Sequence, residues 1–279
     1  MSGRRPLFAT YVGIDYSGAD RPDARIKGLA VAVAQQHKPF RLHCPPLPRH
    51  RSLQSVQLSK ANLWSRRLVY EWLLHELHHS RERMIVGLDH GLSYPSDQLQ
   101  RLGLSNWAEF LHWSSRTWKT TRLTMKQSKE QAEYVNSVAK RLVEREFIPS
   151  TKSVTDLDRI SGMQGAVSYS THTGLPWIYR LRQWQRRGLK VHFWPYDGLH
   201  VPDDCHLITE AYPALYRRRI TATASFERLS EHERDAAYIA EWMQARDQSG
   251  TLAPYLELAT LSQAEQQIAL LEGWVLGCL

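Results

Sequence analysis

The amino-acid sequence predicts an α/β fold in which helices flank one mixed sheet, and three observations lead to this prediction. Three β-rich segments follow one another with short connections, as in an antiparallel meander. A long helical segment then separates two apolar strands, and such a crossover makes the strands it joins parallel. The 279 residues, 42% hydrophobic and 23% charged, have an ordinary globular composition.

The predicted meander occupies the first 44 residues. Residues 8–15 (FATYVGID) are apolar almost throughout, which indicates a strand buried on both faces at the centre of the sheet. Turn residues follow, and residues 26–34 (IKGLAVAVA) and 40–44 predict two more strands joined by a polar turn. A helix is expected over residues 61–80, where apolar side chains recur at helical spacing, and a buried strand over residues 84–89 (MIVGLD).

The second half of the chain begins with a predicted helical insertion at residues 96–190. Its clearest helical patterns are residues 128–147 and 176–187, which a Gly-, Ser- and Thr-rich break at 161–174 separates. Strands at 190–195 and 206–210 follow, then a helix that begins with a capping box at residues 230–233 and a last helix at 262–272. Because no repeat or linker divides the chain, we expect one domain over residues 1–279.

Composition also indicates a compartment and a class of partner. The chain carries 36 Lys and Arg against 28 Asp and Glu, a net charge of +8, which favours a polyanionic partner. Three scattered cysteines cannot form a disulfide framework and indicate a reducing cytoplasm. No apolar stretch is long enough to span a membrane, and the N-terminal residues lack the apolar core of a signal peptide.

Three of the predicted strands end in an acidic residue: Asp15, Asp89 and Glu210. Acids are poor strand formers, and ligands of α/β sheets bind beyond the carboxyl ends of parallel strands, so these carboxylates are expected to converge on one crevice. A fourth acid, Asp235, lies early in the capped helix on the same face as Ile239 and is expected to point at the sheet.

Converging carboxylates need cations between them, and hard oxygen ligands suit Mg²⁺ or Mn²⁺. The pattern predicts Asp15 and Asp89 as the principal metal ligands, with Glu210 and Asp235 completing a second metal site. Two such ions about 4 Å apart would activate a water molecule and stabilise the leaving oxygen of a phosphodiester.

Each acid also has a purely structural interpretation. Asp15 and Asp89 could each stabilise a glycine-containing turn. Glu210 could form an ion pair with an arginine at position 217, 218 or 219, and Asp235 could simply favour the positive end of its helix.

Seven short motifs, taken in order, carry a resemblance to a known family: VGIDYSG (12–18), IVGLD (85–89), GLPWI (174–178), HFWPYDG (192–198), EAYP (210–213), DAA (235–237) and EGWVLG (272–277). The chain resembles the RNase H-like superfamily, nearest its RuvC/YqgF branch, and more specifically domain-of-unknown-function family 429, described as predicted RNase H-like nucleases. The resemblance implies an RNase H-like mixed sheet, a three-strand antiparallel meander plus parallel strands. It also implies that the acids of the strands meet the acid of the C-terminal helix.

Two other patterns resemble known sites. Residues 75–79 (HELHH) match the H-E-x-x-H pattern of zinc proteases, but Glu82 and Ile85 stand where the extended motif has Gly and His, so a solvated histidine cluster is the better interpretation. The strand around Asp15 also resembles the first phosphate segment of actin-like kinases, yet neither a second phosphate hairpin nor a G-x-x-x-x-G-K-[ST] loop is present.

The insertion interleaves aromatic and basic residues, which is the pattern that single-stranded nucleic acid requires for stacking and phosphate contact. The predicted contacts are Arg116, Trp118, Lys119, Arg180, Arg186 and Arg187. In the alternative interpretation, Trp177, Leu181 and Trp184 are core residues and the arginines form a solvated face.

These patterns together favour a Mg²⁺- or Mn²⁺-dependent nuclease that hydrolyses phosphodiester bonds of DNA or RNA. The alternative from a different class is an RNase H-like scaffold that binds nucleic acid or protein without catalysis, with the acids in structural roles.

Overall fold

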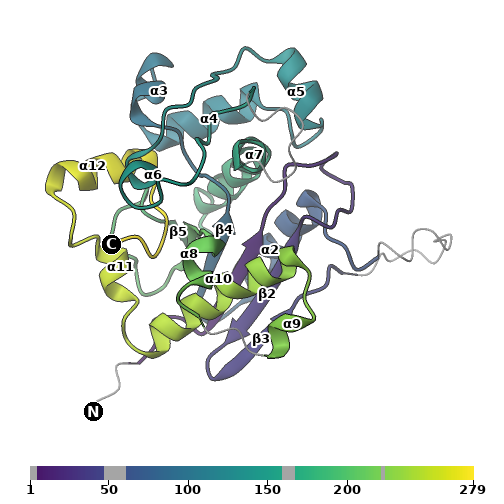
Figure 1. The fold of residues 1–279 in the computed structure, drawn as a ribbon, viewed down its shortest axis with the longest axis vertical. Helices are drawn as coiled ribbons and strands as arrows, with labels where there is room; N and C mark the ends of the chain where they lie inside the picture. Colours follow the sequence, from purple (N-terminus) through teal and green to yellow (C-terminus); the bar gives the residue numbers. More distant parts are fainter. Residues whose placement is uncertain (1–4, 47–60, 159–166, 221–223) are drawn as a thin grey trace.

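Six strands form one mixed sheet in the order β3-β2-β1-β4-β6-β5 in the computed structural model, which describes residues 5–46, 61–158, 167–220 and 224–279 (Figure 1). The antiparallel strands are β1 (Thr10–Asp15), β2 (Ala30–Gln35) and β3 (Lys38–Leu42). The parallel strands that continue the sheet from β1 are β4 (Met84–Asp89), β6 (His206–Glu210) and β5 (Val191–Phe193). This confirms the predicted α/β fold class, a mixed sheet of a three-strand antiparallel meander plus parallel strands flanked by helices, and the arrangement is consistent with an RNase H-like fold.

The two faces of the sheet bury different side chains because successive strand residues point to opposite faces. Tyr11, Ile85 and Leu207 belong to one core cluster, which also contains most of the apolar face of α10 (Glu231–Gln248). Val12 and Val86, one residue further along their strands, belong to the second cluster.

Three helices pack against the strands in the second cluster: α2 (Arg66–His79), α4 (Trp107–Thr117) and α7 (Val167–Gln185). In Figure 1 the helices between β4 and β5 lie in the upper part of the view, and α10 crosses in front of the sheet. The remaining helices are short: α3 (Ser96–Arg101), α5 (Met125–Gln131), α6 (Leu142–Glu146), α8 (Pro213–Arg217), α9 (Ala224–Glu227), α11 (Ala253–Glu257) and α12 (Gln263–Glu272).

The helix predicted over residues 128–147 is wrong. Two short helices, α5 and α6, take its ends, and residues 132–141 between them are not helical. Hydrogen bonds to a distant segment replace the helical ones: the amide of Ser137 donates to the carbonyl of Thr155, and the side chain of Asn136 accepts from the amide of Leu157. The apolar periodicity of this stretch therefore serves tertiary packing rather than one helix.

The helix predicted to begin at residue 176 begins at Val167 instead, so most of the predicted Gly-, Ser- and Thr-rich break is helical. Residues 161–166 of that break lie outside the described residues. Small side chains are needed here because α7 packs closely on the sheet edge. A Cβ atom at Gly174 would lie 2.6 Å from the ring of His90.

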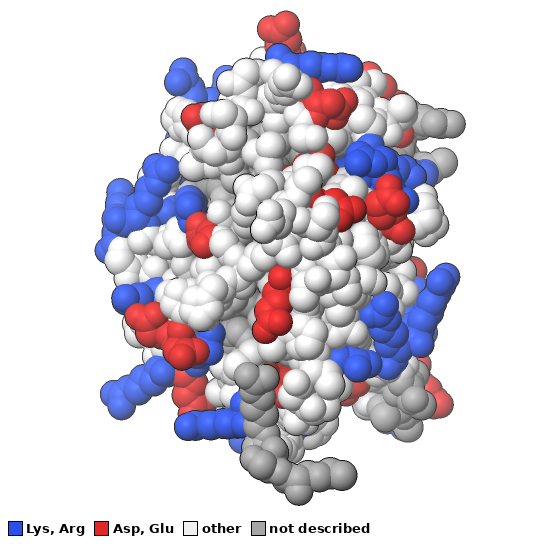
Figure 2. Space-filling model, turned by 90° about the vertical axis from the view of Figure 1, so that its left-hand side faces the viewer, with Lys and Arg blue, Asp and Glu red and all other residues white. Residues whose placement is uncertain are grey.

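Figure 2 shows the side of the molecule that lies to the left in Figure 1, where basic and acidic side chains are interspersed around an area that is mostly uncharged. The net charge of +8 is therefore not expressed on this face as one basic surface.

Within the described ranges, no helix combines the length and the apolar character needed to cross a membrane.

Candidate functional site

Asp15 and Asp89 end two neighbouring parallel strands and lie opposite each other in register. Residues paired in this way point to the same face of the sheet and sit on strands about 4.8 Å apart. Asp15 is 5% exposed and Asp89 is partly exposed. The structure therefore brings together the two acids that the sequence predicts as principal ligands.

The electrostatics of this pair are unfavourable for two negative charges. The pKa of Asp89 is raised well above its ordinary value, first because the surrounding protein desolvates the carboxyl group, and next by the charge of Asp15 and a hydrogen bond with it. The charges of Asp235 and Glu210 raise it further. Two carboxylates so placed repel each other when both are ionised, and a cation bound between them would relieve that repulsion.

A glycine stands two residues before each of the two acids. These glycines explain how closely α10 approaches the strands β1 and β4. Gly13 and Gly87 are register partners, and α10 packs directly over them. A Cβ atom at Gly13 would lie 2.0 Å from the carbonyl oxygen of Ala236, and one at Gly87 would lie 2.5 Å from Cγ2 of Ile239. The shared V-G-x-D pattern of the two strands thus lets α10 lie close to the acids.

The first turns of α10 carry two side chains toward the acid pair. Ser230 and Glu233 form the predicted capping box, which fixes where the helix begins. Nδ1 of His232 lies 2.6 Å from Oδ2 of Asp15, and this hydrogen bond raises the pKa of His232, so the imidazole is a donor to the carboxylate. His232 is not among the residues predicted from the sequence, although its position three residues before Asp235 in a capped helix places both on one face.

Asp235 faces the acid pair but has an arginine partner. Nη2 and Nε of Arg217, in α8, lie 2.5 and 2.9 Å from Oδ1 of Asp235. Burial raises the pKa of Asp235 and Arg217 opposes that rise, while the charge of Asp15 adds to it. Asp235 is thus near the site predicted for it, with its charge balanced by Arg217.

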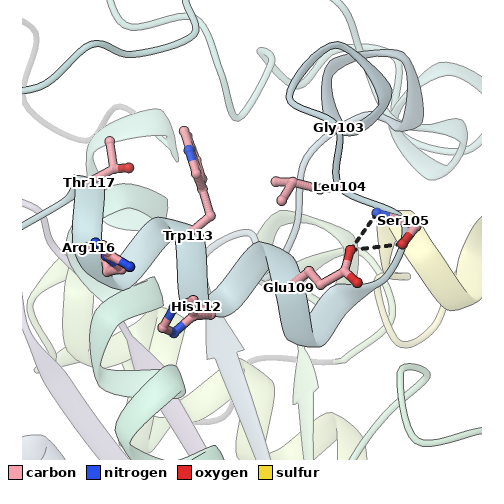
Figure 3. A pocket seen from close by; sticks show the side chains of 8 residues that line it. All are labelled: Gly103, Leu104, Ser105, Glu109, His112, Trp113, Arg116 and Thr117. Carbon is pink, nitrogen blue, oxygen red and sulfur yellow. Dashed lines mark hydrogen bonds between the residues drawn. The ribbon is translucent and has the colours of Figure 1, made fainter.

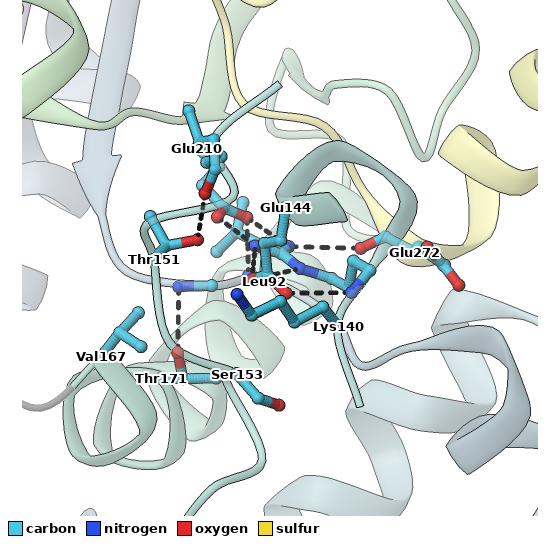
Figure 4. Close-up of polar contacts among 12 residues, drawn as sticks. Leu92, Lys140, Glu144, Thr151, Ser153, Val167, Thr171, Glu210 and Glu272 are labelled. Carbon is cyan, nitrogen blue, oxygen red and sulfur yellow. Dashed lines mark hydrogen bonds and ion pairs between the residues drawn. The ribbon is translucent and has the colours of Figure 1, made fainter. Parts of the chain in front are cut away.

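Glu210 points away from the other acids. Its register partner on β4 is Leu88, one residue before Asp89, so Glu210 lies on the face opposite to Asp89. There the Arg141 guanidinium holds it in two hydrogen bonds, Nη1 to Oε2 at 2.7 Å and Nη2 to Oε1 at 2.5 Å (Figure 4). Glu210 therefore forms a structural ion pair, as in the alternative interpretation of the sequence, but its partner is Arg141 rather than an arginine at position 217, 218 or 219.

Arg141 is 1% exposed and uses its whole guanidinium within the protein. Besides Glu210, it donates through Nε and Nη2 to Oε1 of Glu144 and through Nη1 to the carbonyl oxygen of Glu272. The carboxylate of Glu272 in turn accepts from the amides of Leu142 and Ser96. No donor of Arg141 remains for a ligand, so this network is structural.

These partners decide which residues fit a metal ion. In the described part of the chain, no three His, Cys, Asp or Glu side chains are grouped closely enough to hold one. Asp15 and Asp89 fit a cation, because their negative charges repel each other and the hydrogen bond from His232 is to Asp15 rather than to Asp89. Asp235 becomes a third ligand only if it leaves Arg217, and Glu210 does not fit, because Arg141 already neutralises it.

The six residues predicted to contact nucleic acid differ in their exposure to solvent. Trp118 is wrong as a contact, because it is fully buried and packs edge-on against His172. Arg180 is partly buried, with its guanidinium over the ring of Trp177. The other four predicted contacts are exposed: Arg116, Lys119, Arg186 and Arg187.

No protein-family model matches the chain, and neither the curated proteins nor the solved structures include a significant match.

Proposed function

We propose that this protein is a Mg²⁺- or Mn²⁺-dependent nuclease that hydrolyses phosphodiester bonds of DNA or RNA. The observation that carries the proposal is the in-register pair of Asp15 and Asp89 at the carboxyl edge of an RNase H-like sheet, where ligands of α/β sheets bind. The resemblance of the sequence motifs to predicted RNase H-like nucleases supports the same activity.

In this proposal Asp15 and Asp89 hold the cation. A divalent ion bound there supplies Lewis-acid polarisation of the phosphate and lowers the pKa of a bound water molecule. His232 donates a hydrogen bond to Oδ2 of Asp15 and so orients that carboxylate. Arg217, whose side chain is 42% exposed beside Asp235, is placed to donate to a phosphate oxygen at the rim of the site.

The structure supports one cation at this edge rather than the two expected from the sequence. A second ion was assigned to Glu210 and Asp235, but each of these carboxylates has an arginine partner. Arg141 is buried with all its donors used, so we assign Glu210 to the structural network.

A second candidate function is a non-catalytic scaffold that binds nucleic acid or a protein. It is favoured by the hydrogen bond of His232 to Asp15 and the ion pair of Arg217 with Asp235, which give two of the acids partners without any metal. This candidate predicts no effect of millimolar Mg²⁺ on thermal stability.

The test is a cleavage assay on single-stranded, duplex, hybrid and branched substrates after metal removal, with Mg²⁺ or Mn²⁺ then added. Mutation of a residue that merely supports a metal ligand commonly lowers metal affinity or activity 10- to 100-fold. Replacing a ligand itself should cost at least as much, so D15N and D89N should each cleave roughly 100-fold or more slowly than the wild type. The matched control is D203N, because the Asp203 side chain is fully exposed. Cleavage of no substrate by the wild-type protein, or full activity of D15N, would overturn the proposal.

A further inference from the structure

A hollow lies beside α4, and the acid pair is not among the residues that line it. It has a volume of about 570 Å³ and opens between α4 and the loop before it (Figure 3). We call it the α4 groove; the lining residues used here are Leu104, Ser105, Glu109, His112, Trp113 and Arg116.

Helical periodicity divides α4 into a core face and a groove face. Trp107, Phe110 and Leu111 are buried in the second core cluster. Trp113 is only partly buried: its ring lies 6.0 Å from that of Tyr94 and 6.2 Å from that of Phe110, while the side chain also lines the groove. An indole supported by the core on one side and accessible from the groove is a platform on which a flat ring can stack.

The charges in the groove differ at its two ends. Arg116 is exposed at one end, and within the described ranges its side chain forms no ion pair; the same holds for Lys119, two residues beyond the end of α4. At the other end the Glu109 carboxylate accepts from the amide and the hydroxyl of Ser105, each at 2.8 Å (Figure 3). An anion is therefore accommodated at the Arg116 end, next to Trp113.

Helix α7 connects the groove to the acid site. Near its start, Oγ1 of Thr171 accepts from the amide of Gly91, two residues after Asp89. Eight residues later, the hydroxyl of Tyr179 lies 3.1 Å from Nδ1 of His112 in the groove. At 1.5 Å per residue, Thr171 and Tyr179 lie about 12 Å apart along α7, so this helix links the segment after Asp89 to the groove.

From these observations we infer that the α4 groove binds a single-stranded segment of nucleic acid, with an unpaired base on Trp113 and a phosphate at Arg116. A stacking platform beside an unpaired cation is what single strands use, whereas the base faces of a duplex are already stacked on one another. This inference rests on the proposed nuclease function and narrows its substrate to nucleic acids with an unpaired region.

The experiment measures binding of fluorescent oligo(dT) and oligo(rU), with a blunt DNA duplex for comparison, in the full-length D89N protein so that cleavage does not interfere. We expect W113A and R116A to weaken single-strand binding by about 5- to 100-fold, since each stacked base contributes measurably. W113F should keep most of the affinity, and R41A, an exposed arginine on the edge strand β3, should keep all of it.

Unchanged affinity of both W113A and R116A, or equally tight binding of the blunt duplex, would overturn the inference. Because Arg116 is exposed, R116A carries the test even if W113A fails to fold. The two proposals can be refuted separately. If the wild-type protein cleaves and the groove variants bind with unchanged affinity, only the groove inference is overturned. If the groove variants lose binding but the wild-type protein cleaves no substrate, only the nuclease proposal is overturned.

Discussion

Asp89 is the residue at which the fold and the proposed site conflict. Its carboxyl group is desolvated by the protein around it, although the residue is partly exposed, and it lies beside Asp15, so its ionised form is destabilised in the folded chain. In the unfolded chain the carboxyl group is hydrated and far from Asp15. The folded protein therefore binds a proton at Asp89 more tightly than the unfolded chain does, and this difference makes stability depend on pH.

The sign of that dependence follows from the raised pKa. The stability associated with protonated Asp89 is fully present below the ordinary value of 3.8 and is lost as the pH rises through the folded-state pKa. Without divalent ions, D89N should therefore match the wild-type melting temperature near pH 4 and exceed it at pH 8. Each kcal/mol of relieved repulsion should raise the melting temperature by about 2 to 4 °C.

Thermal unfolding in a metal chelator at both pH values checks this prediction, with D203N as the exposed control. Millimolar Mg²⁺ at pH 8 should then raise the melting temperature of the wild type but not that of D89N, because an ion bound to the folded state alone stabilises it. A D89N variant that is less stable than the wild type at pH 8 without metal would show that the Asp15–Asp89 repulsion is absent.

Most elements of the fold could be predicted from local patterns. The strand at Met84–Asp89 and the strand at His206–Glu210 have the predicted bounds, because each is a short apolar run that a sheet buries on both faces. The start of α10 was found from its capping box, which is a property of four consecutive residues. Residues 132–141 could not be predicted, because their hydrogen-bond partners lie in residues 153–158.

The same distinction applies to the candidate site. The strand-helix-strand order predicts that β4 runs parallel to β1, since β1 and β3 both run antiparallel to β2, but it does not by itself place β4 beside β1. The face on which Glu210 lies depends instead on the register of β6 against β4, which no pattern in either strand specifies. Nor does any local pattern connect Arg141 with Glu210, which are 69 residues apart in sequence.

Arg141 lies just before α6 and forms an ion pair with Glu210 at the end of β6. This ion pair links the insertion to the sheet. Glu144 shares the guanidinium, and both carboxylates are buried. R141M should reduce the free energy of unfolding by about 3 to 5 kcal/mol, because it leaves two buried carboxylates without their cation. Urea unfolding measures this change. R145A, which removes an exposed arginine of the same helix, should change it by less than about 0.5 kcal/mol. An equal loss in the two variants would mean that the network contributes no special stability.

At the scale of the whole molecule, the net charge of +8 is less informative than its distribution. Several arginines are neutralised within the fold: Arg141 by two glutamates, Arg182 by Asp197 and Arg217 by Asp235. The exposed basic residues that remain at α4 and at the end of α7 have no acidic partner within the described ranges. Those residues, rather than the total charge, should determine how strongly a polyanion binds.

The salt dependence of binding distinguishes attraction by the total net charge from attraction by the basic residues at the α4 groove. Each phosphate neutralised on a single strand contributes about −0.7 to the slope of log K against log salt concentration, because condensed counterions are released. If Arg116 and Lys119 each contact a phosphate, R116A/K119A in the D89N protein should make the slope less steep by about 1.4. R41A lowers the net charge without touching the α4 groove and should leave the slope unchanged. Titration of oligo(dT) between about 50 and 200 mM salt measures these slopes. Equal slopes for the double variant and R41A would mean that overall charge, and not the groove, attracts the strand.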